Sequence, residues 1–174
     1  MQTYSHFLLT AVLGQQIQRK KAIHPGKAFL LGSVLPDIPL FFLTIGYILS
    51  RRMNEGANNE FLFGSSFDQM YFNNPWWIAS HNLFHAPFLL LLYGSVGYWL
   101  MRQTARPQWQ KWGCFLFWLA LGCGFHSLLD IFSHVNDGPV LFFPFDWHYR
   151  FRAPFSYWDP RYGGQSNRTF RKPL

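Results

Sequence analysis

Charged side chains are scarce in this sequence. Lys, Arg, Asp and Glu make up only 13% of the 174 residues, about half the share found in a soluble domain of this size. Hydrophobic residues account for 49% and aromatic residues for 21%. A mean hydropathy of −0.02 is nevertheless too low for a bundle buried wholly in lipid. The composition therefore predicts a small protein embedded in or seated on a membrane, with substantial polar ends.

Several familiar motifs are also missing. The chain has no Gly-rich phosphate loop, no GxSxG elbow and no CxxC zinc pair. Its two cysteines, Cys114 and Cys123, both lie in the last apolar run, where they act as small hydrophobic residues and say nothing about a redox compartment. No basic segment precedes the first apolar stretch, so a secretory signal is not predicted.

Acidic residues are fewer than basic ones, which gives a net charge of +7. Such a balance suits anionic lipid headgroups or nucleic acid. Nucleic acid is the weaker interpretation, because the basic residues are spread over several loops and the apolar runs would remain unexplained. We therefore expect membrane lipid as the main partner. Lys and Arg are balanced on the two sides of the apolar segments, so the orientation in the membrane is left open.

The apolar segments predict an all-α fold, a small bundle of about four helices. These segments are residues 4–18, 28–50, 76–101 and 112–135. The first is shorter than the roughly 20 residues that cross a bilayer. Pro36 and Pro39 should break the second. Residues 51–75 are rich in Asn and Gly and predict a loop.

The chain changes character near its C-terminus. We expect residues 1–145 to form the helical bundle and residues 146–174 to form an irregular, basic, aromatic tail. Pro, Gly and aromatic residues punctuate this tail, and short alternating pieces such as HYRFR suggest strand or extended structure. The tail is expected at a headgroup surface or against a protein partner.

The stretch HSLLDIFSH is the most informative motif. His126, Asp130 and His134 are spaced i, i+4 and i+8, so on a helix they lie along one side. Imidazole and carboxylate groups on successive turns are how a helix binds a transition metal. The alternative is a His hydrogen-bonded to Asp130, with the other His capping the helix end.

Three further sites carry candidate metal ligands. His81 and His85 form an HxxxH pair, and His6 lies near the start of the first predicted helix. Asp37 lies between two prolines in an apolar run, where a carboxylate must be paired, protonated or bound to a cation. The alternative for Asp37 is hydrogen bonding to backbone amides freed at the break.

If the predicted helices are antiparallel neighbours, all of these residues fall at one end of the bundle. The start of the third helix then meets the end of the fourth. His24 and His148 stay outside this cluster. The predicted metal ligands are His6, Asp37, His81, His85, His126, Asp130 and His134.

These seven residues exceed the four ligands of a tetrahedral zinc ion. Either two ions bind, with Asp130 or Asp37 as a bridge, or one ion binds and the other residues support its ligands. Nitrogen and carboxylate ligands without thiolate suit a divalent metal, zinc first and Mn or Fe as alternatives.

Four motifs together resemble those of the bacterial membrane-bound metal-dependent hydrolases, of the LexA-regulated inner-membrane type. They are YSHFLLTAVLG, GSVLPDIP, SHNLFHAP, and HSLLDIFSH followed by FFPF, and they cover most of residues 1–145. The resemblance implies a bacterial inner-membrane location and a metal site at the matching His and Asp positions, with His134 as an additional neighbour. Pro39 stands where many members have a second Asp. The HxxxD pattern is also distantly similar to zinc-dependent phospholipase C.

Two functions follow from these patterns. The first is a membrane-associated metal-dependent hydrolase that acts on a phosphoester of a lipid or another amphiphile, an anionic substrate, through metal-activated water. The second is a non-catalytic membrane protein in which the His/Asp cluster binds a structural metal or fixes helix packing. The aromatic tail would then bind a protein partner.

Overall fold

The fold is all-helical across the described parts of the chain. The computed structural model describes residues 3–21, 26–55, 64–103, 105–134, 137–151 and 153. Within these ranges it contains seven helices, which are α1 (Thr3–Lys21), α2 (Gly26–Gly32), α3 (Asp37–Glu55), α4 (Ser65–Asn73), α5 (Pro75–Asn82), α6 (Pro87–Met101) and α7 (Pro107–Ser133). The only β pairing in these ranges is an isolated bridge between Val140 and Arg150.

The all-α class is confirmed, but the expected number of about four helices is wrong. The predicted second helix divides into α2 and α3 at a turn over residues 33–36, where a proline break was expected. The predicted third helix also divides, because Ala86 is extended (ψ 122°) and Pro87 begins α6. Proline disfavours the helical conformation in the residue before it, and it has no N–H to donate to the helical hydrogen bonds.

The remaining additional helix, α4, lies in the segment predicted as a loop. It is followed directly by α5, whose N-terminus is capped by the Asn74 side chain accepting from the backbone N–H groups of Trp76 and Trp77. A side-chain cap of this kind satisfies N–H groups that have no partner inside the helix. Pro75 occupies the first position of α5, where its missing N–H costs nothing.

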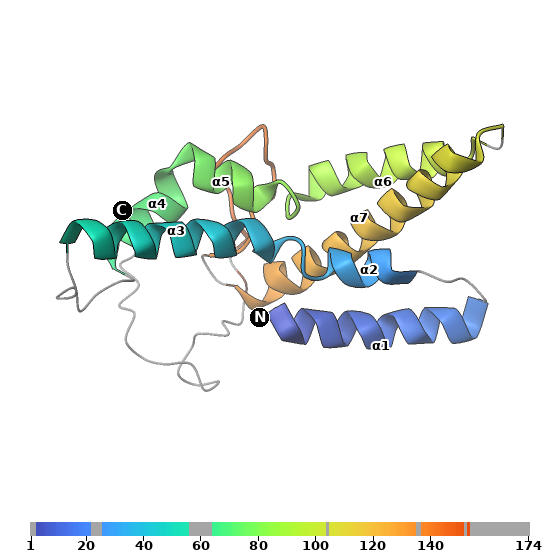
Figure 1. The fold of residues 1–174 in the computed structure, drawn as a ribbon, viewed down its shortest axis with the longest axis horizontal. Coiled ribbons are helices and arrows are strands. Elements are labelled where there is room, and N and C mark those ends of the chain that lie inside the picture. The colour runs from blue at the N-terminus through green and yellow to red at the C-terminus, as the bar shows by residue number, and fades with distance from the viewer. Residues whose placement is uncertain are drawn as a thin grey trace.

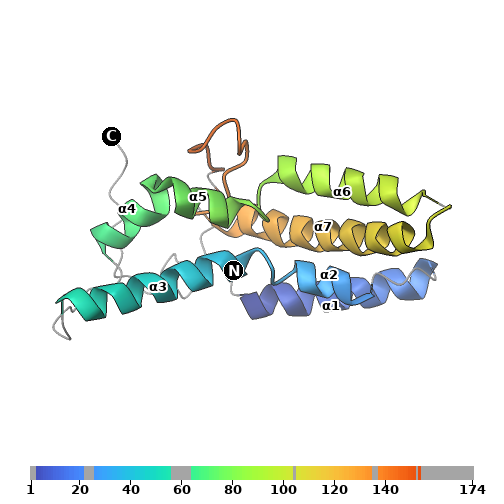
Figure 2. The same ribbon diagram turned by 45° about the horizontal axis from the view of Figure 1, so that its top comes forward.

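The helices form two halves along the long axis of the molecule (Figure 1). Helices α1, α2, α6 and α7 run side by side and form the four-helix half, with α7 between α6 and α2 in both views (Figure 2). Helices α3, α4 and α5 form the three-helix half at the other end. The N-terminus of α1 and the C-terminal end of α7 both lie where the two halves meet.

Glycines bring the helices of the four-helix half into close contact. At Gly32 of α2 and Gly122 of α7, an added Cβ would lie within 3.0 Å of backbone atoms of the facing helix. Gly97 of α6 and Gly113 of α7 form a second contact of the same kind. This close approach holds α7 firmly between its two neighbours.

The apolar exterior agrees with a location in a membrane. Among the described residues, α7 is the one helix that is long and apolar enough to cross a membrane. There are up to three spans if the bent pairs α2–α3 and α5–α6, each bent by 43°, count as one span each. Large side chains such as Leu91, Trp99 and Trp112 are more than 60% exposed.

The residues on both sides of the predicted boundary between bundle and tail pack against the helices. Val140 and Phe143 are buried against Ile78 and Ala86, and Trp147 packs onto this cluster. Residues 154–174 lie outside the described part of the chain. The division into a bundle over residues 1–145 and a tail over residues 146–174 therefore stays a prediction.

Candidate metal centre

The ends of four chain segments meet where the two halves join. His6 comes from the first turns of α1, and Asp37 is the first residue of α3. His81 lies at the end of α5, and His85 lies in the turn between α5 and α6. The last turns of α7 contribute His126 and Asp130, and His134 follows directly. These residues form the candidate metal centre.

Asp130 lies at the middle of this centre, and each of its two oxygens faces two imidazoles. Its Oδ1 is 3.0 Å from Nε2 of His6 and 3.3 Å from Nε2 of His134. Its Oδ2 is 3.1 Å from Nε2 of His126 and 3.6 Å from Nε2 of His85. The two oxygens of Asp130 therefore face different pairs of histidines, as a carboxylate that bridges two metal ions must.

Four residues have the spacing of a metal-binding group. One ligand atom each from Asp37, His85, His126 and Asp130 lies within 4.8 Å of the others. Asp37 joins the group through its Oδ1, which is 3.4 Å from Nε2 of His126. Its other oxygen accepts a hydrogen bond of 2.5 Å from the Thr3 hydroxyl. The break between α2 and α3 thus places a carboxylate opposite the end of α7.

The tautomers of two histidines are set by backbone carbonyls. Nδ1 of His126 is 2.7 Å from the Ser33 oxygen, and Nδ1 of His85 is 2.7 Å from the His81 oxygen. A carbonyl oxygen only accepts, so both Nδ1 atoms carry the proton. In the neutral imidazole Nε2 then has its lone pair directed at the carboxylates. Neither Nε2 makes a hydrogen bond, although both are buried.

This arrangement fits a cation between the imidazoles and the carboxylates. Two lone-pair nitrogens facing carboxylate oxygens repel one another unless a proton or a metal ion lies between them. Metal-bound histidines commonly donate their other N–H to a backbone carbonyl, as His85 and His126 do. The described donors are nitrogen and oxygen atoms, which suit a borderline or hard divalent ion.

His6 is as completely buried as His85 and His126. Its side chain is fully buried, and its ring stacks on that of His126 with centroids 4.0 Å apart. Neither of its ring nitrogens makes a hydrogen bond, although Nε2 faces Asp130. A buried imidazole with two unsatisfied nitrogens is costly. His6 is therefore placed to serve as a ligand on the Oδ1 side of Asp130.

His81 belongs to the centre but is not one of the four grouped residues. Its ring centroid is 4.3 Å from that of His85 and 5.4 Å from that of Tyr71. Its backbone oxygen accepts from His85. Among the described residues, the backbone oxygen of His81 therefore orients the candidate ligand His85.

Two further groups near His134 could not be recognised from the sequence alone. Asp137 Oδ1 is 3.1 Å from Nδ1 of His134, and the Tyr71 hydroxyl donates a 2.6 Å hydrogen bond to the Asp137 backbone oxygen. The contact between His134 and Asp137 has one sequence feature that could have indicated it, the i, i+3 spacing of the two residues. Nothing in the sequence pointed to Tyr71, because its contact joins residues far apart in the chain.

Two neighbouring carboxylates favour the charged form of His134. Burial disfavours its charged form, but the carboxylates of Asp130 and Asp137 outweigh this and raise the pKa of His134 to about 9. Burial alone would raise the pKa of Asp137, whereas the neighbouring His134 lowers it. Without metal, His134 and Asp137 therefore form an ion pair at the edge of the centre.

Arg150 reaches the same edge from the described part of the tail. Its guanidinium lies 5.1 Å from the Tyr71 ring centroid and donates to the Gly138 backbone oxygen. Of the two histidines left outside the predicted cluster, one is described by the structure. His148 is exposed, and His24 lies outside the described residues.

A comparison with protein families gives one match that covers nearly the whole chain. The model of the YdjM inner membrane protein family matches residues 1–170. Comparisons with curated proteins and with solved structures gave no match.

Proposed function

We propose that this chain, which belongs to the YdjM inner membrane protein family, is a metal-dependent hydrolase that cleaves a phosphoester of a lipid or another amphiphile. It is a membrane protein, and its His/Asp cluster has the composition and spacing to hold a metal ion. The reaction and the substrate class are our inference from the chemistry of this cluster.

The observation that supports the proposal best is the pair of buried Nε2 atoms of His85 and His126. Both are directed at carboxylates while their Nδ1 atoms are engaged by backbone oxygens. A hydrogen-bond network built only for packing would normally satisfy such atoms. A site that awaits a cation leaves them facing carboxylate oxygens with no hydrogen bond.

We assign Asp37, His85, His126 and Asp130 as ligands of one divalent ion, zinc first, with Mn or Fe as alternatives. His6 and His134 lie on the opposite side of Asp130 and are assigned to a second ion, if two bind. His81 then orients His85. This assignment keeps six of the seven predicted ligands and gives His81 a supporting role instead.

A bound divalent ion supplies Lewis acidity and lowers the pKa of water to near neutrality. The protein's own contribution is to hold its carboxylates and imidazoles rigidly at the end of α7. Asp37 is the most accessible of the four grouped residues, with 27% of its side chain exposed. A phosphoester would therefore approach the centre from the side of Asp37, while the buried imidazoles keep water away from the other side.

The proposal is tested by metal content and hydrolysis together. Protein purified in detergent should contain bound Zn, Mn or Fe and should cleave bis-p-nitrophenyl phosphate in proportion to metal loading. Asp130→Asn and His126→Ala should each lower the rate by more than about tenfold, since even weaker changes around metal sites cost 10–100-fold. His148→Ala is the matched control, because this histidine is exposed and lies outside the centre. Absence of metal together with unchanged behaviour of His126→Ala would refute the proposal.

A second function is favoured by the complete burial of His6, His85 and His126. A metal enclosed so fully could serve to hold α1, α3, α5 and α7 together, with the tail available to a protein partner. In that case, removing the metal with a chelator would lower the melting temperature, and no phosphodiesterase activity would accompany metal loading.

A further inference from the structure

A cavity of about 590 Å³ lies between α3 and the α4–α5 pair, in the three-helix half. Its size falls within the range of roughly 300–1,000 Å³ typical of small-molecule sites. Its walls are mainly apolar, with hydroxyl groups from Tyr47, Ser50 and Ser80. We call it the α3–α5 groove.

One wall of the groove is a straight stripe along α3. It runs from Pro39 through Leu43 and Gly46 to Ser50, residues that recur every three or four positions. At 1.5 Å per residue this stripe is about 16 Å long. The hydrocarbon core of a bilayer is about 30 Å thick, so the stripe matches about half of it, the depth of one leaflet.

Aromatic rings support the opposite wall and keep the helices apart. Trp77 of α5 contacts Tyr47 edge-on, with ring centroids 6.1 Å apart. Phe67 of α4 lies 5.6 Å from Tyr47 and 5.5 Å from Trp77. These three rings meet edge to face and resist closure of the groove.

The inner end of the groove lies beside the candidate metal centre. Pro39 is two residues from Asp37, and Ser80 directly precedes His81. Asp37 is also the grouped residue with the most exposed side chain. One end of the apolar groove thus lies within a turn, along the chain, of two residues of the site proposed to act on a phosphoester.

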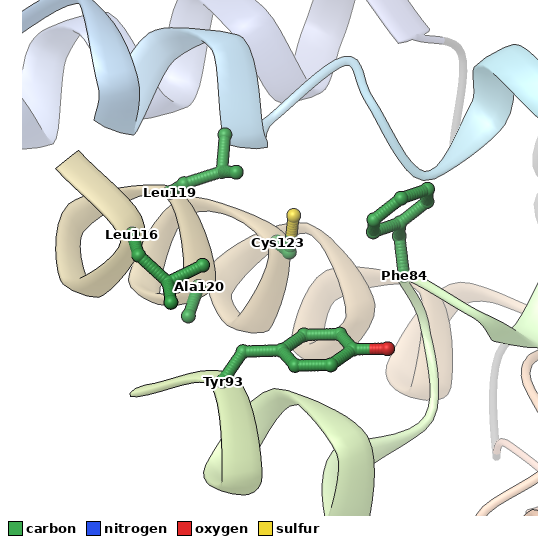
Figure 3. A pocket seen from close by; sticks show the side chains of 6 residues that line it. All are labelled: Phe84, Tyr93, Leu116, Leu119, Ala120 and Cys123. Carbon is green, nitrogen blue, oxygen red and sulfur yellow. The ribbon is translucent and has the colours of Figure 1, made fainter. Parts of the chain in front are cut away.

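A second cavity cannot take the same ligand. It lies between α6, α7 and the turn before α6, and Figure 3 shows its six lining side chains, among them Phe84, Tyr93 and Cys123. Its volume is about 120 Å³, less than the roughly 150 Å³ of an apolar cavity that holds one benzene molecule. Only the α3–α5 groove, of these two, is large enough for a long chain.

We propose that the α3–α5 groove binds the hydrocarbon chain of a lipid-like substrate whose phosphoester lies at the metal centre. This inference rests on the proposed function. The substrate is then an amphiphile with a single hydrocarbon chain in the groove. This chain is long enough to reach through one leaflet.

Filling the groove tests the proposal directly. A Cβ added at Gly46 meets no atom within 4 Å, so Gly46→Phe should place its ring in the groove without displacing the backbone. Gly124→Phe is the matched control, because Gly124 is equally open and lies on α7, outside the groove. Leu43→Trp fills the same groove from the neighbouring turn and serves as the second variant if Gly46→Phe does not fold.

Binding is measured with hexadecyl phosphate that carries a photoreactive diazirine in its chain. In the wild type, peptides of α3 and α5 should be labelled most strongly. Labelling of these peptides should fall about tenfold in Gly46→Phe, the change expected for a loss of about 1.4 kcal/mol in binding, and stay at the wild-type level in Gly124→Phe. Labelling spread evenly over the outer faces of α6 and α7, or unaffected by Gly46→Phe, would show contact with bulk lipid only and overturn the proposal.

Hydrolysis separates this inference from the proposed function. For dodecyl and methyl esters of p-nitrophenyl phosphate, the ratio of kcat/KM values should fall about tenfold in Gly46→Phe, because only the longer chain reaches along the groove. An unchanged ratio would refute the groove while leaving the hydrolase intact. If the wild type cleaves neither ester, the proposed function fails, and the labelling experiment alone decides whether the groove binds the chain.

Discussion

The two halves of the molecule pack by different means. In the four-helix half, glycines let α2 and α6 approach α7 until backbones touch, as at Gly32 and Gly122. In the three-helix half, α3 meets α5 through large rings, and the α3–α5 groove remains between them. Small residues at helix interfaces are the usual means of close packing in membranes. The contrast suggests that one half fixes the metal centre and the other gives access to it.

The metal centre depends on both halves because it lies where they join. Helices α1 and α7 supply His6, His126 and Asp130, whereas α3 and α5 supply Asp37 and His81. A change that separates the halves should therefore disturb the centre even where it touches no ligand.

The largest effect is expected from overfilling the four-helix half. Gly122→Leu would drive a side chain into the backbone of α2 at Phe29 and Gly32. We expect destabilisation by more than about 3 kcal/mol, beyond the usual cost of overpacking, because backbone atoms cannot move aside as side chains do. Thermal unfolding in detergent measures this, and Gly124→Leu on an open part of α7 is the control. Equal melting temperatures for the two variants would mean that the glycine contact is unimportant.

A smaller effect is expected where a polar contact ties the segment that follows α7 to the three-helix half. The buried Asn82 side chain accepts a 2.7 Å hydrogen bond from the Val140 N–H and donates one of 2.7 Å to the Ile78 oxygen. Asn82→Ala leaves the buried Val140 N–H without its partner, which should cost about 1–3 kcal/mol. Urea unfolding would show this as a lower midpoint.

Asn54→Ala, at an exposed position of α3, serves as the control for that measurement. If Asn82→Ala unfolds at the same urea concentration as Asn54→Ala, the packing of the segment that follows α7 does not depend on this contact.

The smallest effect, of opposite sign, is expected at Gly46 in the three-helix half. Gly46→Ala adds a methyl group where no atom lies within 4 Å. It should stabilise the protein by about 0.5–1 kcal/mol, because alanine loses less conformational freedom in a helix than glycine does. A melting temperature one to a few degrees higher is the expected result. A lower one would show that α3 packs more tightly than the groove indicates.

Sequence reasoning was most successful for features that depend on spacing within one helix. The i, i+4 relation of His126 and Asp130 required only that their segment be helical, and their side chains lie 3.1 Å apart. The expected break near Pro36 depended on backbone chemistry alone. The division before Pro87 was missed because apolar and aromatic residues lie on both sides of it, so the composition still favoured one long helix.

Contacts between distant segments could not be predicted in the same way. His126 directs its Nδ1 at the oxygen of Ser33, 93 positions away. Asp137 and Tyr71 are joined across 66 positions. Their geometry depends on how α2 and α4 are placed relative to α7, and no periodicity in the sequence contains that information.

Helix periodicity and composition act locally, so the helical class, the apolar character and the His and Asp residues at helix ends can be predicted from the sequence. The packing of the helices is what makes Asp130 face imidazoles on both of its oxygens and leaves a groove between α3 and α5. These features arise from the relative placement of packed helices. That placement is governed by close contacts such as Gly32 against Gly122, which depend on the shape of both partners together.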